Sequence, residues 1–518
     1  MIKDIEYTVE PAFINDLEHQ KAIIARRLSY SVKEVTALRI TKKSIDARSK
    51  NPIFRVKALA YVNEEPKELY PEIKYHNCEG NKQVVIVGSG PAGLFAALKL
   101  LESGIKPVLL ERGKDVQSRR RDLRAIQQES IVNPDSNYCF GEGGAGTYSD
   151  GKLYTRSTKR GDVHKILNVL YQHGAQKEIL VDAHPHIGSN ILPKVVQGIR
   201  ETILRCGGEF HFDARVDGLI INGNKINGVI VNGEQEFRGE AVILATGHSA
   251  RDIYYLLARY NVLMEAKPFA VGVRIEHPQA LIDSIQYHSE SRHPNLPAAS
   301  YSLTCQVGEK GVYSFCMCPG GIIIPASTSQ EELVLNGMSV SQRNSRFANS
   351  GFVVSVNEKD WSGFEKQGIF AGLEFQKSIE AEAYKWGNNS QKAPAQRVTD
   401  FVNNKVSSTL PDTSYIPGTI SADMRNIFPA GIAESLRKAL LVFNGKMRGY
   451  LTEEAQLLAA ETRTSSPLRI PRDKETLQHT VVEGLYPCGE GAGYAGGIVS
   501  AAIDGERCAE AVKVKMGS

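Results

Sequence analysis

The sequence predicts an α/β protein: a Rossmann-like dinucleotide-binding domain, an α+β domain inserted into it, and a small α+β domain in front. Residues 88–93 (GSGPAG) form a GxGxxG motif between an apolar strand pattern and a helix pattern. A second glycine-rich segment, residues 489–497, precedes a small-residue helix near the C-terminus. The 518 residues are too many for one ordinary core. The dinucleotide-binding domain is therefore expected to consist of two distant segments.

Composition places the chain among ordinary globular proteins. Apolar residues make up 42%, charged residues 23%, and the net charge is +4. This charge is too small to argue for nucleic acid or an anionic membrane as partner. No apolar run approaches the roughly 20 residues that a membrane span needs, and the first residues, MIKDIEYTVE, lack a secretory signal pattern. Eight cysteines without a CxxC pair favour a reduced, cytoplasmic protein.

Three domains are expected from the changes in pattern along the chain. Residues 1–78 form the small N-terminal α+β domain, with a helix over residues 16–28 and strands over 37–47 and 53–62. The discontinuous dinucleotide-binding domain comprises residues 79–263 and 459–518, and residues 264–458 form the inserted substrate domain.

Each part of the GxGxxG motif has a physical task. Gly88 makes the tight turn, Gly90 lets the backbone approach a pyrophosphate, and Gly93 lets the helix pack closely on the strand. The helix N-terminus places partial positive charge at the phosphates. Glu111 ends the next strand and is placed to accept a hydrogen bond from a ribose hydroxyl.

Two further segments favour FAD over NAD. A run of short strands is expected over residues 210–213, 219–221, 226–231 and 236–238, with Asn-Gly turns at 222–223 and 232–233. This run leads into an apolar strand and Ala-Thr-Gly at 245–247. This order resembles the FAD domain of the glutathione-reductase-like flavoproteins. In that superfamily, the segment matching residues 484–498 holds the ribityl chain and the edge of the flavin. The resemblance therefore implies FAD and a Rossmann-like FAD-binding domain of the glutathione-reductase type.

No second nucleotide-binding domain is visible. Residues 141–146 (GEGGAG) lack a preceding apolar strand and a following helix, so we interpret them as a glycine-rich loop over the flavin or its phosphates. A purely structural turn is the alternative. NAD(P)H would then bind transiently as electron donor, unless the substrate itself is the donor.

Longer motifs resemble the bacterial uncharacterised FAD-dependent dehydrogenases. These motifs are GSGPAGLFAA (88–97), FGEGGAGTYSDGKL (140–153), PHIGSN (185–190), ATGHSARD (245–252), FCMCPGG (315–321), NGMS (336–339), APAQRVTDF (393–401), ETRTSSPLRIPRD (461–473) and CGEGAGYAGGI (488–498). The resemblance implies an FAD-containing oxidoreductase and names no substrate. The motifs and the resemblance together predict the following cofactor-binding residues: Gly88, Gly90, Pro91, Ala92, Gly93, Glu111, Arg112, Gly144, Val216, Ala245, Thr246, Gly247, Gly489, Glu490, Gly496, Gly497 and Ile498.

The expected function is an FAD-dependent oxidoreductase that acts on a small-molecule substrate by hydride transfer at flavin N5. The candidate acids or bases lie in the motifs on the flavin side: Asp150, Lys152, His186 and His248. His248 is favoured because it directly follows Ala-Thr-Gly, with a packing or capping role as the alternative. No metal is expected, since the histidines lack an accompanying ligand pattern.

Two other functions stay open. A flavin-dependent tRNA-modifying enzyme would use the basic run at residues 119–121 and 124. A non-catalytic flavoprotein would bind a partner through its N-terminal domain.

Cys316 and Cys318 form a CxC sequence in a strand-like segment. Their sulfurs would face the same side of a strand, which permits redox or metal chemistry. Two buried thiols in a reduced protein are the alternative.

Overall fold

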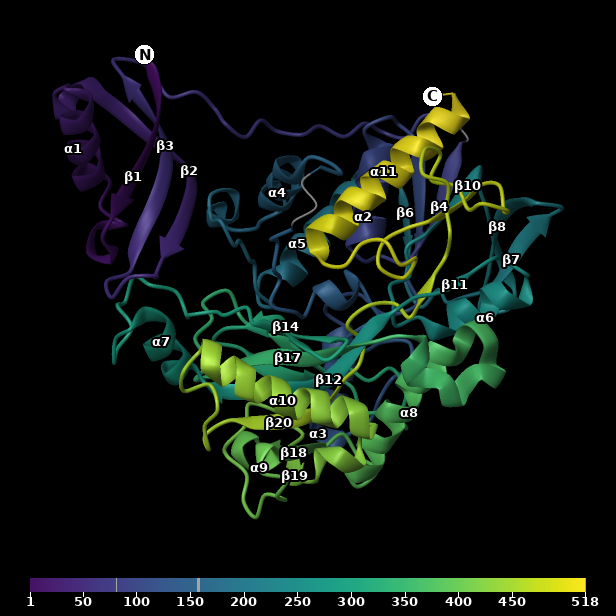
Figure 1. The fold of residues 1–518 in the computed structure, drawn as a ribbon. Coiled ribbons are helices and arrows are strands. Elements are labelled where there is room, and N and C mark those ends of the chain that lie inside the picture. Colours follow the sequence, from purple (N-terminus) through teal and green to yellow (C-terminus); the bar gives the residue numbers. More distant parts are fainter. Residues whose placement is uncertain (81, 156–158, 518) are drawn as a thin grey trace.

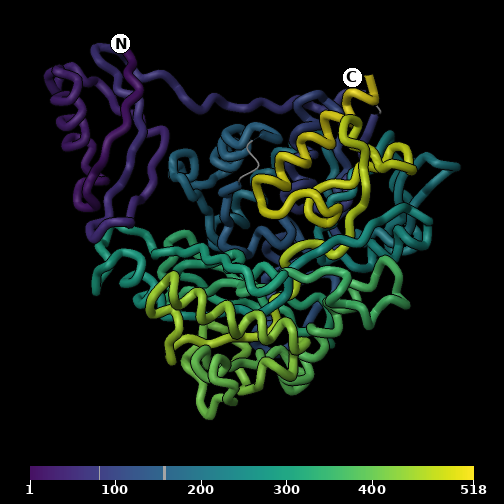
Figure 2. The backbone as a smooth tube through the Cα atoms, viewed as in Figure 1, coloured from purple at the N-terminus to yellow at the C-terminus, as the bar shows by residue number. Residues whose placement is uncertain are grey.

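The computed structural model describes residues 1–80, 82–155 and 159–517. Figures 1 and 2 show a small N-terminal domain joined by a long extended segment to a larger body, which contains two main sheets. Among the described residues, no helix combines the length and apolar composition needed to cross a membrane.

The N-terminal domain is a three-stranded antiparallel sheet, in the order β1-β3-β2, with one helix. Helix α1 (Leu17–Leu28) begins after Asp16, whose side chain accepts a hydrogen bond from the His19 backbone N–H and caps the helix. The predicted helix and two strands are confirmed as α1, β2 (Val35–Asp46) and β3 (Ile53–Val62). The sequence interpretation missed β1 (Ile2–Val9).

A five-stranded parallel sheet has the order β22-β10-β4-β5-β6. Its strands are β4 (Gln83–Val87), β5 (Lys106–Leu110), β6 (Glu209–His211), β10 (Ala241–Leu244) and β22 (Leu485–Pro487). Apolar strands of this kind are typical of sheets buried on both faces. Strands β4 and β22, about 400 residues apart in sequence, thus lie in the same sheet. Because β4, β10 and β22 are parallel, their carboxyl ends lie at the same edge of that sheet, where ligands of such folds bind.

The predicted strand meander is shorter than expected. The segment around Phe210 belongs to β6 of the parallel sheet, so this part of the expectation was wrong. The remaining strands form a separate antiparallel sheet of β7 (Val216–Asn222), β8 (Lys225–Val231) and β9 (Gln235–Arg238).

Two helices pack closely beside the parallel sheet (Figure 1). A Cβ atom on Gly505 of α11 (Ile498–Met516) would lie 2.0 Å from the Ala92 carbonyl oxygen of α2 (Pro91–Leu101). Only glycine fits that contact, which brings both helix N-termini near each other. The other helices of this part are α3 (Arg119–Glu129), α4 (Val163–Gln172), α5 (Leu192–Arg205) and α6 (Arg251–Arg259).

The second large sheet has seven strands in the order β13-β14-β17-β12-β20-β18-β19. They are β12 (Phe269–Pro278), β13 (Thr304–Val307), β14 (Lys310–Cys318), β17 (Phe347–Val356), β18 (Ala393–Arg397), β19 (Thr419–Ser421) and β20 (Gln456–Glu461). Helices α7 (Gln279–Tyr287), α8 (Ala371–Trp386), α9 (Val398–Val402) and α10 (Ala430–Lys446) accompany it, as do the short pairs β15 (Ile322–Pro325) with β16 (Leu335–Met338) and β11 (Glu265–Ala266) with β21 (Leu468–Arg469).

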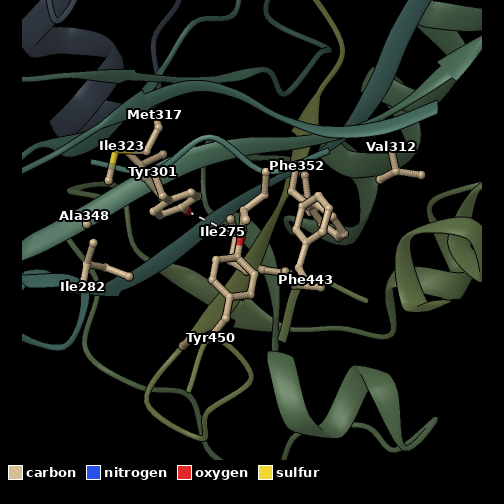
Figure 3. Close-up of a cluster of buried hydrophobic side chains, with 14 of the residues drawn as sticks. Ile275, Ile282, Tyr301, Val312, Met317, Ile323, Ala348, Phe352, Phe443 and Tyr450 are labelled. Atoms are coloured by element: carbon tan, nitrogen blue, oxygen red, sulfur yellow. Dashed lines mark hydrogen bonds between the residues drawn. The ribbon is translucent and has the colours of Figure 1, made fainter. Parts of the chain in front are cut away.

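The core of this second unit lies between the seven-stranded sheet and its helices (Figure 3). Phe352 of β17 meets Phe443 of α10 edge-on with ring centroids 5.4 Å apart. The Tyr301 and Tyr450 hydroxyls lie 3.4 Å apart. Met317 of β14 is also buried in this core, which anchors the middle of the Cys-Met-Cys sequence.

Candidate active site

A cavity of about 490 Å³ opens between the parallel sheet and the seven-stranded sheet. Its walls come from the turn between β4 and α2, the loop at residues 144–154, the segment after β10, the strand ends of β14 and β20, and the start of α11. All the predicted cofactor-binding residues except Gly93 line it. The volume lies in the range typical of ligand sites.

The GxGxxG turn has the geometry that its sequence predicts. Gly88 has a φ of +100°, and a Cβ on Gly93 would lie 1.9 Å from the Gly88 carbonyl oxygen. Gly93 therefore serves close packing and not the cavity wall. Gly90 caps α2 and lines the cavity, and a Cβ there would meet no described atom within 4 Å. The helix N-terminus thus faces open space suited to an anionic group.

Glu111 connects three loops at one end of the cavity. One carboxylate oxygen accepts from the Ser89 backbone N–H at 3.1 Å and the Ser89 hydroxyl at 2.7 Å. The other accepts from the backbone N–H groups of Gly113 at 2.9 Å and Gly141 at 3.0 Å. Four protein donors occupy the four acceptor positions of this carboxylate. Glu111 therefore positions the glycine loops, and its contact with a ribose stays a prediction.

Arg119 holds the glycine-rich loop from behind. Its side chain is fully buried and donates to the carbonyl oxygens of Asn137 at 2.7 Å, Glu142 at 3.0 Å and Gly144 at 3.0 Å. Burial lowers the pKa of its guanidinium. Helix α3 turns this member of the basic run inward, so the Arg119 side chain is not on the surface that a nucleic acid would meet.

The segment after β22 returns to the cavity beside α2. The Gly489 backbone N–H donates to Asp504 at 2.8 Å, and Gly497 caps α11 with a φ of +91°. Glu490 lies 3.3 Å from His248 Nδ1, so these two candidate residues form a pair on the cavity wall. A second helix N-terminus, that of α11, therefore reaches the cavity.

Cys488, Asp504 and Cys508 carry ligand atoms close enough together to hold a metal ion. The Arg472 guanidinium already occupies this group, with contacts of 2.6 Å to Asp504 Oδ1 and 3.4 Å to Cys508 Sγ. This cation neutralises the carboxylate that a metal would need.

The seven-stranded sheet contributes a distinct wall. Cys316 of β14 and Glu461 of β20 line the cavity there, joined from the glycine-loop side by Lys152. Arg274 of β12 lies behind them, 3.1 Å from Glu461 Oε2 and 2.9 Å from the Cys316 carbonyl oxygen. Strand β14 bulges at this point, and Cys316 adopts a φ of +46°. A bulge beside a cavity commonly re-aims a side chain toward a site.

Among the carboxyl groups at this wall, Glu461 has a pKa suited to proton exchange near neutral pH. Burial raises its pKa to about 7, although the charge of Arg274 acts in the opposite direction. At neutral pH both its protonated and its ionised form are populated, which suits a group that gives or takes a proton. The sequence interpretation did not single out Glu461 as an acid or base.

The structure separates the four predicted acids or bases. Asp150, Lys152 and His248 line the cavity, and His186 does not. Burial lowers the pKa of His186 to about 4, and its Nε2–H donates to the Ser341 carbonyl oxygen at 2.9 Å. His186 thus packs in a loop outside the lining of the cavity, and its role near the substrate stays a prediction.

Asp150 is fixed as an anion. Burial opposes its ionisation, but the charges of Lys152 and Arg343 lower its pKa to about 2. Arg343 pairs with it at 2.5 Å, and the Ser339 hydroxyl donates to it as well. A carboxylate held this firmly as an anion does not exchange protons near neutral pH, so Asp150 positions Lys152.

A buried ion network joins the two sheets next to the cavity. Glu380 of α8 contacts Arg251 of α6 at 2.7 Å and Arg463, just after β20, at 3.1 Å. Glu332 contacts Arg463 at 2.5 Å. Residues 461–469 contain two arginines and four hydroxyl side chains, a pattern that suggests either an anion or cofactor-edge contact or a hydrogen-bonded loop. In the described part of the chain, the anions that meet Arg463 are these carboxylates.

Comparisons with known proteins identify the family. Residues 268–464 match the family described as "FAD-dependent protein, C-terminal domain-like", and residues 81–130 match "FAD binding domain". Residues 1–61 match a domain of unknown function. An uncharacterized protein of Clostridium beijerinckii is 42% identical over 517 residues, which cover 96% of each chain. The chain belongs to this family of FAD-dependent proteins. FAD is its cofactor, and the chain is a flavoprotein of the oxidoreductase class.

More distant matches add less. Para-nitrophenol 4-monooxygenase from a Pseudomonas species is 31% identical over 112 residues, 17% of this chain and 28% of that protein. A geranylgeranyl bacteriochlorophyll reductase-like protein from Thermoplasma acidophilum aligns over 85% of this chain and 80% of its own, with 12% identity and a TM-score of 0.35. CtdE in complex with FAD aligns over 84% and 88%, with 10% identity and a TM-score of 0.32. Scores this low carry no structural argument.

The cavity of this FAD-dependent protein fits its cofactor in three respects. Gly90 leaves open space at the N-terminus of α2. Arg112 lines the cavity with its guanidinium held by Asp135 at 2.7 Å and Asp252 at 2.8 Å. The buried hydroxyl of Ser249, which also lines the cavity, has no hydrogen-bond partner within the described part of the chain. A buried hydroxyl without a partner is costly unless a ligand supplies one.

Proposed function

We propose that the protein is an FAD-dependent dehydrogenase or reductase whose small-molecule substrate binds against the wall formed by β14 and β20. FAD supplies hydride chemistry at its N5 position when it is bound. The observation that carries the proposal is Glu461: a buried carboxyl group on the cavity wall with a pKa raised to about 7.

We assign a role toward FAD to the predicted cofactor-binding residues from their positions around the cavity. Gly88 and Gly90, at the start of α2, would hold the pyrophosphate, with Arg112 toward the adenosine end. Gly497 and Ile498, at the start of α11, would lie at the pyrimidine edge of the flavin, where the helix dipole favours negative charge. This arrangement corresponds to an FAD domain of the glutathione-reductase type.

The domain boundaries follow from the same proposal. Residues 79–263 and 459–518 would bind FAD, and residues 264–458 would bind the substrate. Strand β20 continues to Glu461 and the matched family region to residue 464, so the functional boundary extends slightly past 458. A reducing, cytoplasmic location agrees with eight free cysteines.

Glu461 would exchange the proton that accompanies hydride transfer. Arg274 orients the carboxyl group at 3.1 Å without fully stabilising its ionised form. In reduction of a substrate, the protonated carboxyl donates, so the rate falls as pH rises through about 7. His248, paired with Glu490 on the cavity wall, is a second candidate.

The electron donor can be tested directly. We expect NADH or NADPH to bleach the flavin absorbance of the oxidised protein in anaerobic stopped-flow experiments, with a rate that saturates as the donor concentration rises. If the nucleotide binds only transiently, the bleaching rate should saturate only at high donor concentration, and no stable complex with the nucleotide should form. Absence of bleaching with either nucleotide would overturn the nicotinamide-driven reaction.

The proton affinity of Glu461 can be tested without a substrate. Ionisation of a carboxyl group beside the flavin should perturb the absorbance of bound FAD, with an apparent pKa of about 7. Glu461→Gln should remove this transition. Glu453→Gln, on an exposed turn before β20, is the matched control and should retain it. A transition that persists unchanged in Glu461→Gln would show that another group titrates there.

A further inference from the structure

Two thiols share one ammonium group on the cavity wall. Lys152 Nζ lies 3.7 Å from Cys316 Sγ and 3.9 Å from Cys318 Sγ. Arg274 Nη2 lies 3.5 Å from Cys318 Sγ. Both sulfurs therefore face the same side of β14, as the CxC spacing predicts, although the strand bulges between them.

The two cysteines differ in access. Cys316 is exposed and lines the cavity, whereas Cys318 is buried behind it and its S–H donates to the Cys316 carbonyl oxygen at 3.3 Å. The anchored side chain of Met317 fixes both positions. This is the arrangement of an attacking thiol at a surface with a second thiol behind it.

The charges around the pair favour a thiolate at Cys316. The adjoining Cys318 thiol lowers the pKa of Cys316 well below its ordinary value, and the charges of Lys152 and Arg274 reinforce this. Desolvation by the surrounding protein acts against it, although the side chain itself is exposed to the open cavity. The Asp150 carboxylate acts in the opposite direction. The pKa of Cys318 is raised, by its hydrogen bond with Cys316 and by burial. One sulfur is thus activated and the other keeps its proton.

We propose that Cys316 and Cys318 form a redox-active dithiol that reduces a small-molecule disulfide bound in the cavity. This inference names the substrate class of the proposed function, and its regeneration step rests on that function. Asp150, 3.9 Å from Lys152 Nζ, and Arg343 behind it act as positioning residues for the ammonium group.

The chemistry balances in three steps. The Cys316 thiolate attacks one sulfur of the substrate disulfide, which forms a mixed disulfide and releases one thiolate. Cys318 then gives its proton to the released thiolate and attacks Cys316 Sγ, which forms the Cys316–Cys318 disulfide and releases the second half of the substrate as a thiolate, so that the products are one thiol and one thiolate. Two electrons have passed from the protein to the substrate. The protein disulfide returns to thiolate and thiol by accepting one hydride equivalent, for which reduced FAD is the donor.

Oxidised glutathione serves as the probe. The FAD-loaded protein, reduced and freed of reductant, is treated anaerobically with oxidised glutathione, alkylated and mapped by peptide mass spectrometry. We expect the loss of two thiols and a disulfide within the single peptide that contains both cysteines. The Cys318→Ser variant should stop at a glutathione adduct on Cys316. Wild-type protein that keeps both thiols free, or that stops at the adduct, would overturn the proposal.

The role of Lys152 has a separate readout. Alkylation of Cys316 by iodoacetamide should proceed readily at pH 6, and Lys152→Met should slow it several-fold at that pH, because loss of the ammonium group raises the thiol pKa. Cys305→Ser is the control, since Cys305 on the neighbouring strand β13 is half-buried and burial raises its pKa. Alkylation of Cys316 that is independent of Lys152 would contradict the assignment.

The same samples separate this proposal from the proposed function. If the flavin bleaches with NADH or NADPH but no protein disulfide forms with oxidised glutathione, the dithiol proposal is refuted and the proposed dehydrogenase function is supported. A protein disulfide that forms with oxidised glutathione, in protein whose flavin stays oxidised when NADH or NADPH is added, would support the dithiol and refute the nicotinamide donor.

Discussion

Replacing Gly90 with alanine should yield a folded protein that binds FAD at least about tenfold more weakly, a loss of about 1.4 kcal/mol. A Cβ at this position meets no described protein atom within 4 Å, so the fold has room for it. The same methyl group would occupy the space where the backbone approaches the pyrophosphate. The FAD content after dialysis and the Kd from flavin fluorescence measure the effect.

Two other glycines provide the controls for Gly90→Ala. A Cβ on Gly431, in the first turn of α10, would also meet no described atom within 4 Å, but this position faces solvent; Gly431→Ala should bind FAD normally. Gly93→Ala should fail to fold properly, because its Cβ would lie 1.9 Å from a carbonyl oxygen. Undiminished FAD binding by Gly90→Ala would place the pyrophosphate away from α2.

Glu380→Ala should lower the free energy of unfolding by about 3 kcal/mol, because it removes one of the two carboxylates, Glu380 and Glu332, that pair with the buried guanidinium groups of Arg251 and Arg463. Burial disfavours the ionised form of Glu380, but Arg251 and Arg463 hold its pKa well below the ordinary range. A group with a lowered pKa stabilises the fold above its unfolded pKa of about 4.3. The contribution is therefore present at neutral pH and is lost only in strong acid. The first unfolding transition in urea measures the loss.

The matched control lies on the same helix. Glu382 pairs with Lys385 at 3.4 Å on the exposed side of α8, and Glu382→Ala should change the free energy of unfolding by no more than about 0.5 kcal/mol. If Glu380→Ala proves as mild as this control, the network does not hold the two sheets together.

Local patterns predicted most of the elements around the cofactor. The strand–turn–helix around Gly88 follows from short-range rules, because each glycine answers a local steric demand. Strand β1 was missed although buried Ile5, Tyr7 and Val9 alternate along it, since charged residues fill its other face. The segment around Phe210 was assigned to the wrong sheet, because pairing partners are not encoded in a strand's own pattern.

The substrate wall was less predictable for the same reason. Glu461 ends an apolar strand and acquires its raised pKa only when folding buries it. The pairing of β20 with β12 also brings Arg274 beside it, 187 residues away in sequence, and this charge limits the rise. The one sequence feature that could have pointed to Glu461 is a lone carboxylate at the end of an apolar strand. Helical spacing puts the arginines of the run at residues 119–124 on different faces, and only the packing of α3 against the glycine-rich loop shows that Arg119 is the buried one.

A crystal structure of the FAD-loaded protein would show directly where the flavin ring lies relative to β14 and β20. We expect the pyrophosphate at the N-terminus of α2, the pyrimidine edge at the N-terminus of α11, and the flavin N5 facing Cys316 and Glu461 across the cavity. A flavin ring bound outside this cavity, or turned so that N5 faces away from both side chains, would contradict the proposed site.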